Sequence, residues 1–253
     1  MEPMRSACVI RAGVAMAACG VLLTTVAACG ADGGDSGKKA TEGANSSGGE
    51  SQGAEARAAD LKRIPGVGDR YQKQIPANAR QVVAVYGDGK DAAGSTLALY
   101  TKSGDTWKKQ RGWSGHNGKR GWTTSHHEGD NRSPVGVFTL SDAGGVLADP
   151  GAKLPYTRSA SFQAPHYWSK SHWHDFDYVV AIDYNRAKGT SPNDPTRPQG
   201  QSKGGSIWLH MDHGSGTSAC VSQSKGDMEY LLKTLDPKQH PVVVMGDKAE
   251  LKA

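Results

Sequence analysis

The chain has 253 residues, of which 36% are hydrophobic and 33 are glycine. Its formal net charge is +5 at neutral pH, and the basic residues are scattered. Such a charge favours weak attraction to anionic surfaces such as a cell wall, and it gives no sign of nucleic-acid recognition. The composition indicates that part of the chain does not fold. A globular part of roughly 190 residues is still large enough to bury one core.

The N-terminus has the pattern of an export signal. An uncharged apolar stretch, Ala12–Ala28, follows two arginines, and it is too short for a membrane span but suits a secretory signal. The stretch ends in Val26-Ala27-Ala28-Cys29-Gly30, which resembles the bacterial lipobox. Residues 1–28 are therefore predicted to be a lipoprotein signal peptide, with Cys29 as the lipid anchor. The predicted location is extracytoplasmic, on the cell membrane and facing the cell wall. An ordinary cleaved signal without lipid is one alternative, and Cys19 in Ala17-Ala18-Cys19-Gly20 is a weaker second match to the lipobox, with a very short apolar stretch before it.

A tether is predicted between the signal peptide and the folded domain. Residues 29–60 are mostly Gly, Ser, Ala, Asp, Glu and Lys, with almost no large apolar side chain. Such a segment buries too little surface to offset the entropy lost on ordering, so it is expected to be disordered. Its length would lift a domain at residues 61–253 away from the membrane.

Of the four cysteines, only Cys220 lies in the predicted folded domain. Cys8 and Cys19 would leave with the signal peptide, and Cys29 would carry lipid. Cys220 then remains as a single thiol in a compartment that favours disulfides. Such a thiol is either a passive buried side chain or a reactive group.

Strand patterns dominate from residue 81 onward, and only one strong helix pattern occurs. Apolar residues at helical spacing between Met228 and Leu235 predict that helix, with Ser224 and Asp227 as a capping box before it. Asp236-Pro237 ends it. The fold class predicted from these patterns is a mainly antiparallel β domain with minor helix. The expected strands are Gln81–Tyr86, Thr96–Tyr100, Thr106–Gly112, Gly136–Leu140, Tyr178–Asp183, Ser206–His210 and Val242–Met245.

The segment Ser206–Ser222 combines a histidine and the single thiol. The segment begins with a predicted strand, continues through a predicted turn at Gly214-Ser215-Gly216, and ends in a second predicted extended stretch. If the two pieces pair as a hairpin centred on Ser215, His210 lies directly opposite Cys220. Opposed side chains have Cβ atoms about 4.5–5.5 Å apart, close enough for an imidazole to reach a thiol.

That pairing suits nucleophilic catalysis. A free thiol has a pKa of about 8.5, and a nearby histidine raises its reactivity and can protonate a leaving amine. The backbone N–H groups of Ala219 and Cys220 are candidates for stabilising an oxyanion. The small residues Ser218 and Ala219 leave room for substrate. The alternative is a structural hairpin that holds a buried cysteine.

Three parts of the sequence resemble one known family. Ile207-Trp208-Leu209-His210, the Gly-rich turn and Thr217-Ser218-Ala219-Cys220-Val221 resemble the active-site signature of the L,D-transpeptidase (YkuD-type) family. Asp130–Phe138 resembles its "DgrTPxGxF" segment. Ile64–Gly68 and Gln81-Val82-Val83 resemble the domain start of its actinobacterial-type members. The resemblance covers most of residues 61–247, and the His/Cys element is its specific part.

The resemblance implies a YkuD-like antiparallel β-sandwich or barrel with minor helices, formed by residues 61–253. It implies an acyltransferase that takes up a peptidoglycan stem peptide as a thioester on Cys220 and passes it to an amine of another stem. On this basis His210 is the general base and acid, and the backbone carbonyl of Met211 orients its ring. No cofactor or metal is expected, and the expected partners are stem peptides and, through the lipid, the cell membrane.

Two departures from the family keep other functions open. Many members have His-Gly before the cysteine, where this chain has Ser218-Ala219, and a Cβ at position 219 would disturb the oxyanion site if φ there is positive. An L,D-carboxypeptidase would use the same site with water as acceptor. A wall-binding lipoprotein without turnover is a second alternative.

The other histidines offer a different chemistry. His172 and His174 would alternate onto one face of a strand, as zinc ligands can. With His213 they would build a zinc peptidase, although no HExxH spacing accompanies them. Asp212 and His213 are either a second polar pair beside the site or residues of the turn.

Overall fold

A computed structural model describes residues 62–253. The predicted signal peptide, the predicted lipidation site at Cys29 and the predicted tether lie outside these residues. Among the helices that are described, none has the length and apolar character needed to cross a membrane.

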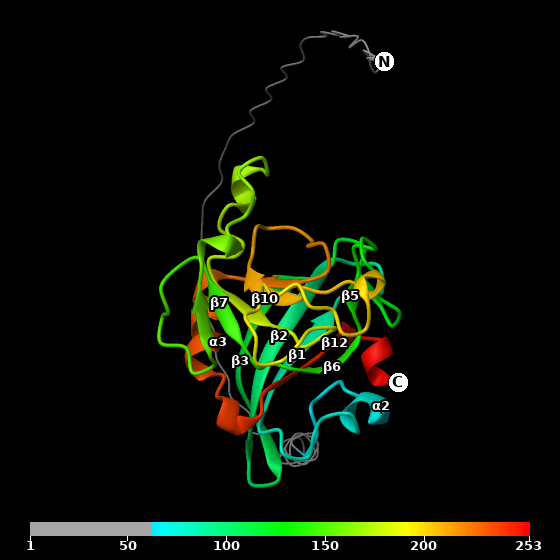
Figure 1. The fold of residues 1–253 in the computed structure, drawn as a ribbon. Coiled ribbons are helices and arrows are strands. Elements are labelled where there is room, and N and C mark those ends of the chain that lie inside the picture. The colour runs from blue at the N-terminus through cyan, green and yellow to red at the C-terminus, as the bar shows by residue number, and fades with distance from the viewer. Residues whose placement is uncertain (1–61) are drawn as a thin grey trace, which may run out of the picture. The chain divides into compact units, whose positions relative to one another are not determined.

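One large sheet organises residues 62–253 (Figure 1). Ten strands form it, and a separate pair, β4 (Trp122–Thr123) and β5 (Ser133–Pro134), forms a second small sheet. The strands of the large sheet are, in spatial order, β6 (Gly136–Thr139), β12 (Val242–Asp247), β1 (Gln81–Gly87), β2 (Gly94–Ser103), β3 (Thr106–His116), β11 (Val221–Gln223), β10 (Trp208–Met211), β9 (Val179–Ala181), β7 (Ala143–Gly145) and β8 (Tyr156–Arg158).

The central strands are apolar on both faces, so each face needs a cover. On β1, Val83 and Val85 belong to one core cluster, and Val82 and Ala84 belong to another. Side chains of a strand alternate between the two faces of a sheet, which explains this division. The uninterrupted apolar run Val82-Val83-Ala84-Val85 is therefore typical of a strand buried on both faces.

Two helical groups cover the two faces. Helix α3 (Lys225–Thr234) packs Met228, Leu231 and Leu232 into the first cluster. The short helix α2 (Asp69–Gln72) and the C-terminal turn η5 (Glu250–Lys252) close the second cluster with Tyr71 and Leu251. Figure 1 shows α2 beside the C-terminus, away from α3. The remaining single turns are η1 (Ala160–Phe162), η2 (Lys170–His172), η3 (Gln201–Lys203) and η4 (Pro237–Gln239).

The start of α3 follows the predicted capping pattern. The side chain of Ser224 accepts a hydrogen bond from the backbone N–H of Asp227, which satisfies one of the free donors of the first turn. The helix ends at Thr234, directly before Leu235 and Asp236-Pro237.

The prediction of a mainly β fold with few helices is confirmed, but the sheet is mixed. Parallel pairs join β1 to β12, β7 to β8 and β10 to β11, while the other neighbours are antiparallel. The predicted hairpin of residues 206–222 is wrong, because β10 and β11 run in the same direction. His210 pairs with Ser222, not with Cys220.

Candidate active site

A cavity of ≈ 540 Å³ lies at the end of β10, where the predicted nucleophile and base both reach its wall. Four segments of chain enclose it: the region around η2, the end of β10, the connection to β11 and the loop after β3. Its lining residues are Lys119, Trp168, Ser169, His172, Asp175, Phe176, His210, His213, Ser215, Gly216, Thr217, Ser218 and Cys220.

The parallel register puts Cys220 and His210 on one side of the sheet. Leu209 and Val221, which pair with each other, belong to the main core. The neighbours of these two residues along each strand therefore point to the opposite face. Both Cys220 and His210 line the cavity there, although the chain reaches this arrangement without a hairpin.

Two backbone groups fix the sulfur of Cys220. The N–H of Trp208 donates to Sγ at 3.4 Å, and the thiol donates to the carbonyl of Ser206 at 3.5 Å. Burial, with a smaller contribution from the nearby Asp175, raises the pKa of Cys220 to about 12, and the hydrogen bond from Trp208 opposes this rise. The resting thiol is therefore protonated at neutral pH.

His210 is held as a neutral base. Its side chain is buried, and Nδ1 lies 2.7 Å from the carbonyl oxygen of Met211. A carbonyl only accepts, so Nδ1 carries the proton and Nε2 keeps its lone pair. Burial lowers the pKa of His210, and this effect outweighs the opposing influence of Asp175 and of the bond to Met211. Such an imidazole is ready to accept a proton at neutral pH.

The carbonyl that accepts the hydrogen bond of the Cys220 thiol belongs to Ser206, whose backbone conformation is unusual. Ser206 has a φ of 52°, a region that few non-glycine residues adopt. Its hydroxyl accepts a hydrogen bond from Nη2 of Arg197 at 2.6 Å. Nothing in the sequence pointed to Arg197, because the two residues meet only through the fold of the loop between them.

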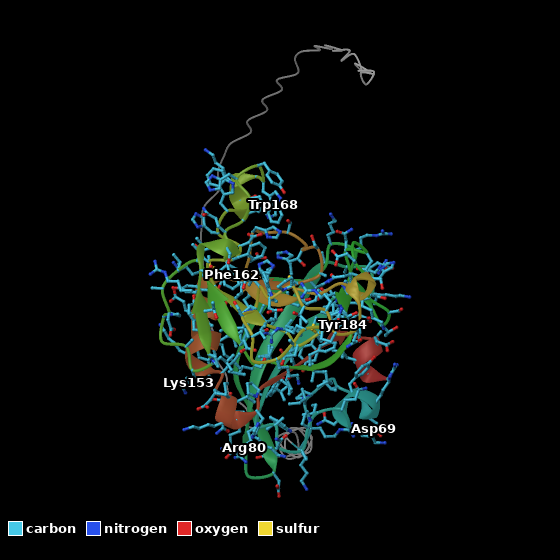
Figure 2. The ribbon with its side chains drawn as sticks, viewed as in Figure 1. Asp69, Arg80, Lys153, Phe162, Trp168 and Tyr184 are labelled. Atoms are coloured by element: carbon cyan, nitrogen blue, oxygen red, sulfur yellow. The ribbon has the colours of Figure 1, made fainter. Side chains whose placement is uncertain are left out.

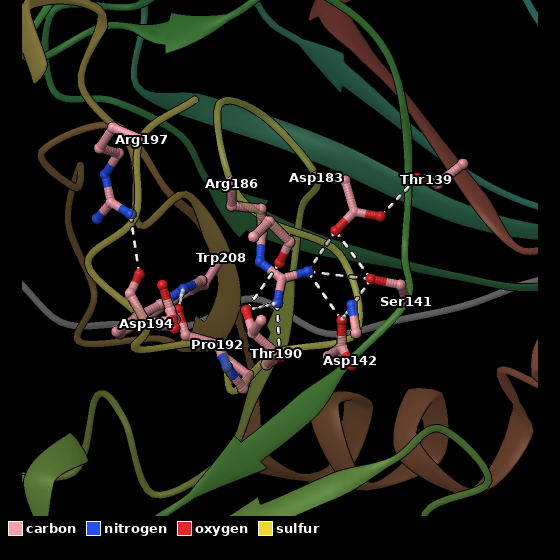
Figure 3. Close-up of polar contacts among 12 residues, drawn as sticks. Thr139, Ser141, Asp142, Asp183, Arg186, Thr190, Pro192, Asp194, Arg197 and Trp208 are labelled. Carbon is pink, nitrogen blue, oxygen red and sulfur yellow. Dashed lines mark hydrogen bonds and ion pairs between the residues drawn. The ribbon is translucent and has the colours of Figure 1, made fainter. Parts of the chain in front are cut away.

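That loop is fastened to the sheet at two more points, which Figure 3 shows. Arg186 forms buried ion pairs with Asp142 and Asp183, and Nε1 of Trp208 donates to the carbonyl of Pro192 at 3.1 Å. Buried ion pairs of this kind are poor evidence for net stability, but they fix one geometry. The loop therefore holds the carbonyl of Ser206 and the N–H of Trp208 in fixed positions beside the Cys220 sulfur.

The other side of Cys220 is held by Ser133, the first residue of β5. Its fully buried hydroxyl donates to the carbonyl of Ala219 at 2.7 Å, lies 3.1 Å from that of Cys220, and accepts from the N–H of Gly118 at 2.9 Å. Thr217 donates to the Cys220 carbonyl at 2.7 Å. The segment Asp130–Phe138 was singled out by resemblance, and its contact with the cysteine loop gives Ser133 a positioning role that the sequence did not reveal.

The backbone N–H groups next to the Cys220 sulfur are available to stabilise an oxyanion by hydrogen bonding. Within residues 62–253, the N–H groups of Ala219 and Cys220 have no hydrogen-bond acceptor. Four described non-glycine residues have a positive φ, and Ala219 is not among them. Its Cβ packs in the main core. Alanine at this position therefore causes no left-handed strain.

A second polar group shares the cavity. The carboxylate of Asp175 lies 2.9 Å from Nδ1 of His172 and 3.1 Å from Nδ1 of His213. The expected strand at residues 172–174 is absent, since His172 belongs to the turn η2. His174 points elsewhere, with its side chain 75% exposed and paired with Asp177. His172 and His213 line the cavity without His174, which the zinc-peptidase alternative would need as a third ligand.

Two aromatic side chains, Trp168 and Phe176, line this cavity. Trp168 is 38% exposed and Tyr167 is 86% exposed. Figure 2 shows Trp168 on the segment that projects furthest beyond the sheet. Phe176 packs edge-on against both Trp168 and His210, so the exposed aromatic segment is connected by contact to the candidate base.

Comparison with known proteins assigns the family. The model of the YkuD family, the L,D-transpeptidase catalytic domain, matches residues 77–244. Among solved structures, that of Bd1075 from Bdellovibrio bacteriovorus is similar at 15% sequence identity and a TM-score of 0.38, over 76% of this chain and 57% of that chain. No curated protein matches the sequence. Because the family model spans more than half of the chain, the protein belongs to the YkuD family of L,D-transpeptidase catalytic domains.

Proposed function

We propose that this protein is an exported cysteine acyltransferase that cross-links or remodels peptidoglycan through a Cys220 thioester. The observation that carries the proposal is the shared cavity of a fixed thiol and a buried histidine whose Nε2 is free to accept a proton. Membership in a family of L,D-transpeptidases that act on peptidoglycan supports the substrate class.

In the acylation step, the sulfur of Cys220 attacks the stem-peptide carbonyl that follows the L-centre of the diamino acid. Nε2 of His210 takes the thiol proton as the S–C bond forms, because the pKa of the thiol is too high for a resting thiolate. The N–H groups of Ala219 and Cys220 stabilise the oxyanion. When the intermediate collapses, the C–N bond breaks and His210 protonates the departing D-alanine amine, leaving a thioester.

In the transfer step, an amine of a second stem attacks the thioester carbonyl. His210 accepts the amine proton and returns it to the departing sulfur, so the enzyme regains its resting state. Water in place of the amine gives the tripeptide, which is the carboxypeptidase outcome. Ser218, exposed at the cavity wall, leaves this approach open.

We further propose that the protein is an actinobacterial-type lipoprotein anchored at Cys29. The lipobox-like residues Val26–Gly30 and the polar segment that follows support this location. The anchor would keep the enzyme at the membrane while residues 29–60 give the catalytic domain reach into the wall.

The function is tested by incubating the full-length protein with a disaccharide-tetrapeptide and analysing products by liquid chromatography and mass spectrometry. We expect release of free D-alanine together with a cross-linked dimer, and neither product with the Cys220→Ala variant. Tripeptide without dimer would assign hydrolysis. An unchanged tetrapeptide with the wild-type protein would contradict the proposal.

A further inference from the structure

A cluster of metal-ligand side chains lies in the same cavity but outside the proposed thioester chemistry. His172, Asp175 and His213 each offer one ligand atom, and these atoms lie within 4.8 Å of one another. All three residues line the cavity. They come from two separate segments, η2 with the turn after it and the connection that follows β10, so the chain brings them together only in the folded state.

His213 is the unusual member, because its polar atoms are buried without partners. Its side chain is 4% exposed, and among residues 62–253 neither ring nitrogen makes a hydrogen bond. Nδ1 lies 3.1 Å from Oδ2 of Asp175 without the alignment of a hydrogen bond. An unpaired buried polar group destabilises the folded state. A nitrogen lone pair that does not point at the carboxylate is free to bind a third atom.

The spacing fits a small divalent ion. Four-coordinate zinc has bonds of about 2.0–2.2 Å to nitrogen and carboxylate oxygen, so its ligand atoms are about 3.3 Å apart. The Nδ1–Oδ2 distances here are 2.9 Å for His172 and 3.1 Å for His213. Around a zinc ion these two distances would lengthen by only a few tenths of an ångström, and the ligand atoms of the two histidines lie within 4.8 Å of each other.

The ligand chemistry is that of a transition metal with an open position. Two imidazoles and one carboxylate bind zinc in sites that leave the fourth position to water or substrate. Imidazole disfavours magnesium and calcium, which prefer oxygen ligands. Each histidine must present a ring nitrogen without a proton to the ion, so Nδ1 of His172, which lies 2.9 Å from Oδ2 of Asp175, would carry no proton as a ligand.

We propose that His172, Asp175 and His213 form a site for a divalent transition-metal ion, with Zn²⁺ as the natural occupant and an open fourth position facing the Cys220 cavity. No step of the thioester chemistry passes through this site. The open position suits an anionic oxygen such as a carboxylate. The ion also joins two loops, so it stabilises the folded state in proportion to its occupancy.

The test is a titration of the full-length protein, stripped with a chelator and desalted, against Zn²⁺ in competition with a chromophoric indicator. We expect one equivalent to bind, a raised melting temperature, and no response to Mg²⁺. Replacing Zn²⁺ with Co²⁺ reports the ligands, since a four-coordinate N/O site absorbs in the visible region. A sulfur-to-cobalt charge-transfer band in the near ultraviolet would overturn the open fourth position.

Matched variants separate ligands from neighbours. His213→Gln and His172→Gln should each lower affinity by more than the roughly 10- to 100-fold that outer-shell changes cause. His174→Gln, three-quarters exposed and paired with Asp177, should bind like the wild type, and so should Cys220→Ala. The side chain of His172 is 32% exposed, so the His172→Gln variant tests the site even if His213→Gln fails to fold. Wild-type affinity in both ligand variants, or no binding by the wild type, would overturn the proposal.

Discussion

The chemistry of the candidate site depends on whether the thiol proton resides on Cys220 or on His210. Burial raises the pKa of Cys220 to about 12 and lowers the pKa of His210. At neutral pH the pair is therefore a thiol and an imidazole, not a thiolate and an imidazolium. The hydrogen bond from Nδ1 to Met211 makes Nε2 the only basic nitrogen of His210.

This protonation state predicts the acid limb of the pH profile. A histidine with a lowered pKa stays neutral until the pH falls below its ordinary value of 6.5. The acylation rate should therefore be constant through neutral pH and decline only as the pH falls below about 6.5. Stopped-flow acylation rates across pH measure this. A rate that keeps rising between pH 7 and 9 would indicate direct use of the thiolate and contradict the neutral pair.

Ala219 gives a second prediction at the residue scale. Its backbone has no positive φ and its methyl group packs in the core, so glycine would gain no conformational advantage there. Ala219→Gly should lower the free energy of unfolding by about 0.5–1 kcal/mol. The acylation rate should not increase. Urea unfolding and acylation kinetics test both parts, and a tenfold faster enzyme would show that alanine hinders the oxyanion site.

At the scale of secondary-structure elements, local patterns predicted the strands but not their partners. The strands around residues 81–116 and the helix that begins after Ser224 were predicted because apolar periodicity and capping are properties of neighbouring residues. The connection between β10 and β11 was interpreted as a hairpin because short Gly-containing loops usually form one. Contacts from distant chain hold it instead: the N–H of Thr217 donates to Asn117, and that of Lys119 donates to Thr217. These partners cannot be read from the loop itself.

The same limit applies to the positioning residues of the site. Cys220 and His210 were identifiable from residue type and family resemblance. Ser133 and Arg197 were not, because a serine 86 residues away from Ala219 has no local pattern that connects it with a cysteine. Asp175 and not His174 lies beside His172, because the chain forms a single turn where the alternating histidines predict a strand.

The contact between β5 and the cysteine loop predicts the effect of removing one hydroxyl. Ser133→Ala deletes the bond to Ala219 and leaves the N–H of Gly118 without an acceptor. We expect a loss of about 1–3 kcal/mol in the free energy of unfolding and an acylation rate at least tenfold lower. The exposed Ser114 on β3 provides the matched control, because Ser114→Ala should change stability by less than about 0.5 kcal/mol. Equal behaviour of the two variants in urea unfolding and acylation would contradict the role of Ser133.

At the scale of the whole molecule, the proposal requires the catalytic domain to work at a distance from a membrane anchor. Residues 62–253 contain the ten-stranded sheet and the candidate site. Export and lipidation rest on residues 1–30, whose composition and order predict them without reference to the fold. The positive net charge of the chain is consistent with attraction to an anionic wall.

The anchor is tested by membrane fractionation of cells that produce the full chain. Cys29→Ser should prevent lipidation and move the protein from the membrane fraction to the soluble extracytoplasmic fraction. Cys19→Ser, which changes a cysteine within the predicted signal peptide, should leave it in the membrane fraction. Retention of the Cys29 variant in the membrane, or release by the Cys19 variant, would contradict the assignment of Cys29.

The measurement that tests the central claim most directly is intact-mass spectrometry of the full-length protein during reaction with a tetrapeptide stem. The account predicts a mass increase equal to the stem peptide without its terminal D-alanine, located on Cys220 after digestion. Cys220→Ala should show no adduct, and His210→Gln should form the adduct about 10²- to 10⁴-fold more slowly, as expected for loss of a general base. An unmodified wild-type protein, or an adduct that persists in Cys220→Ala, would contradict the account.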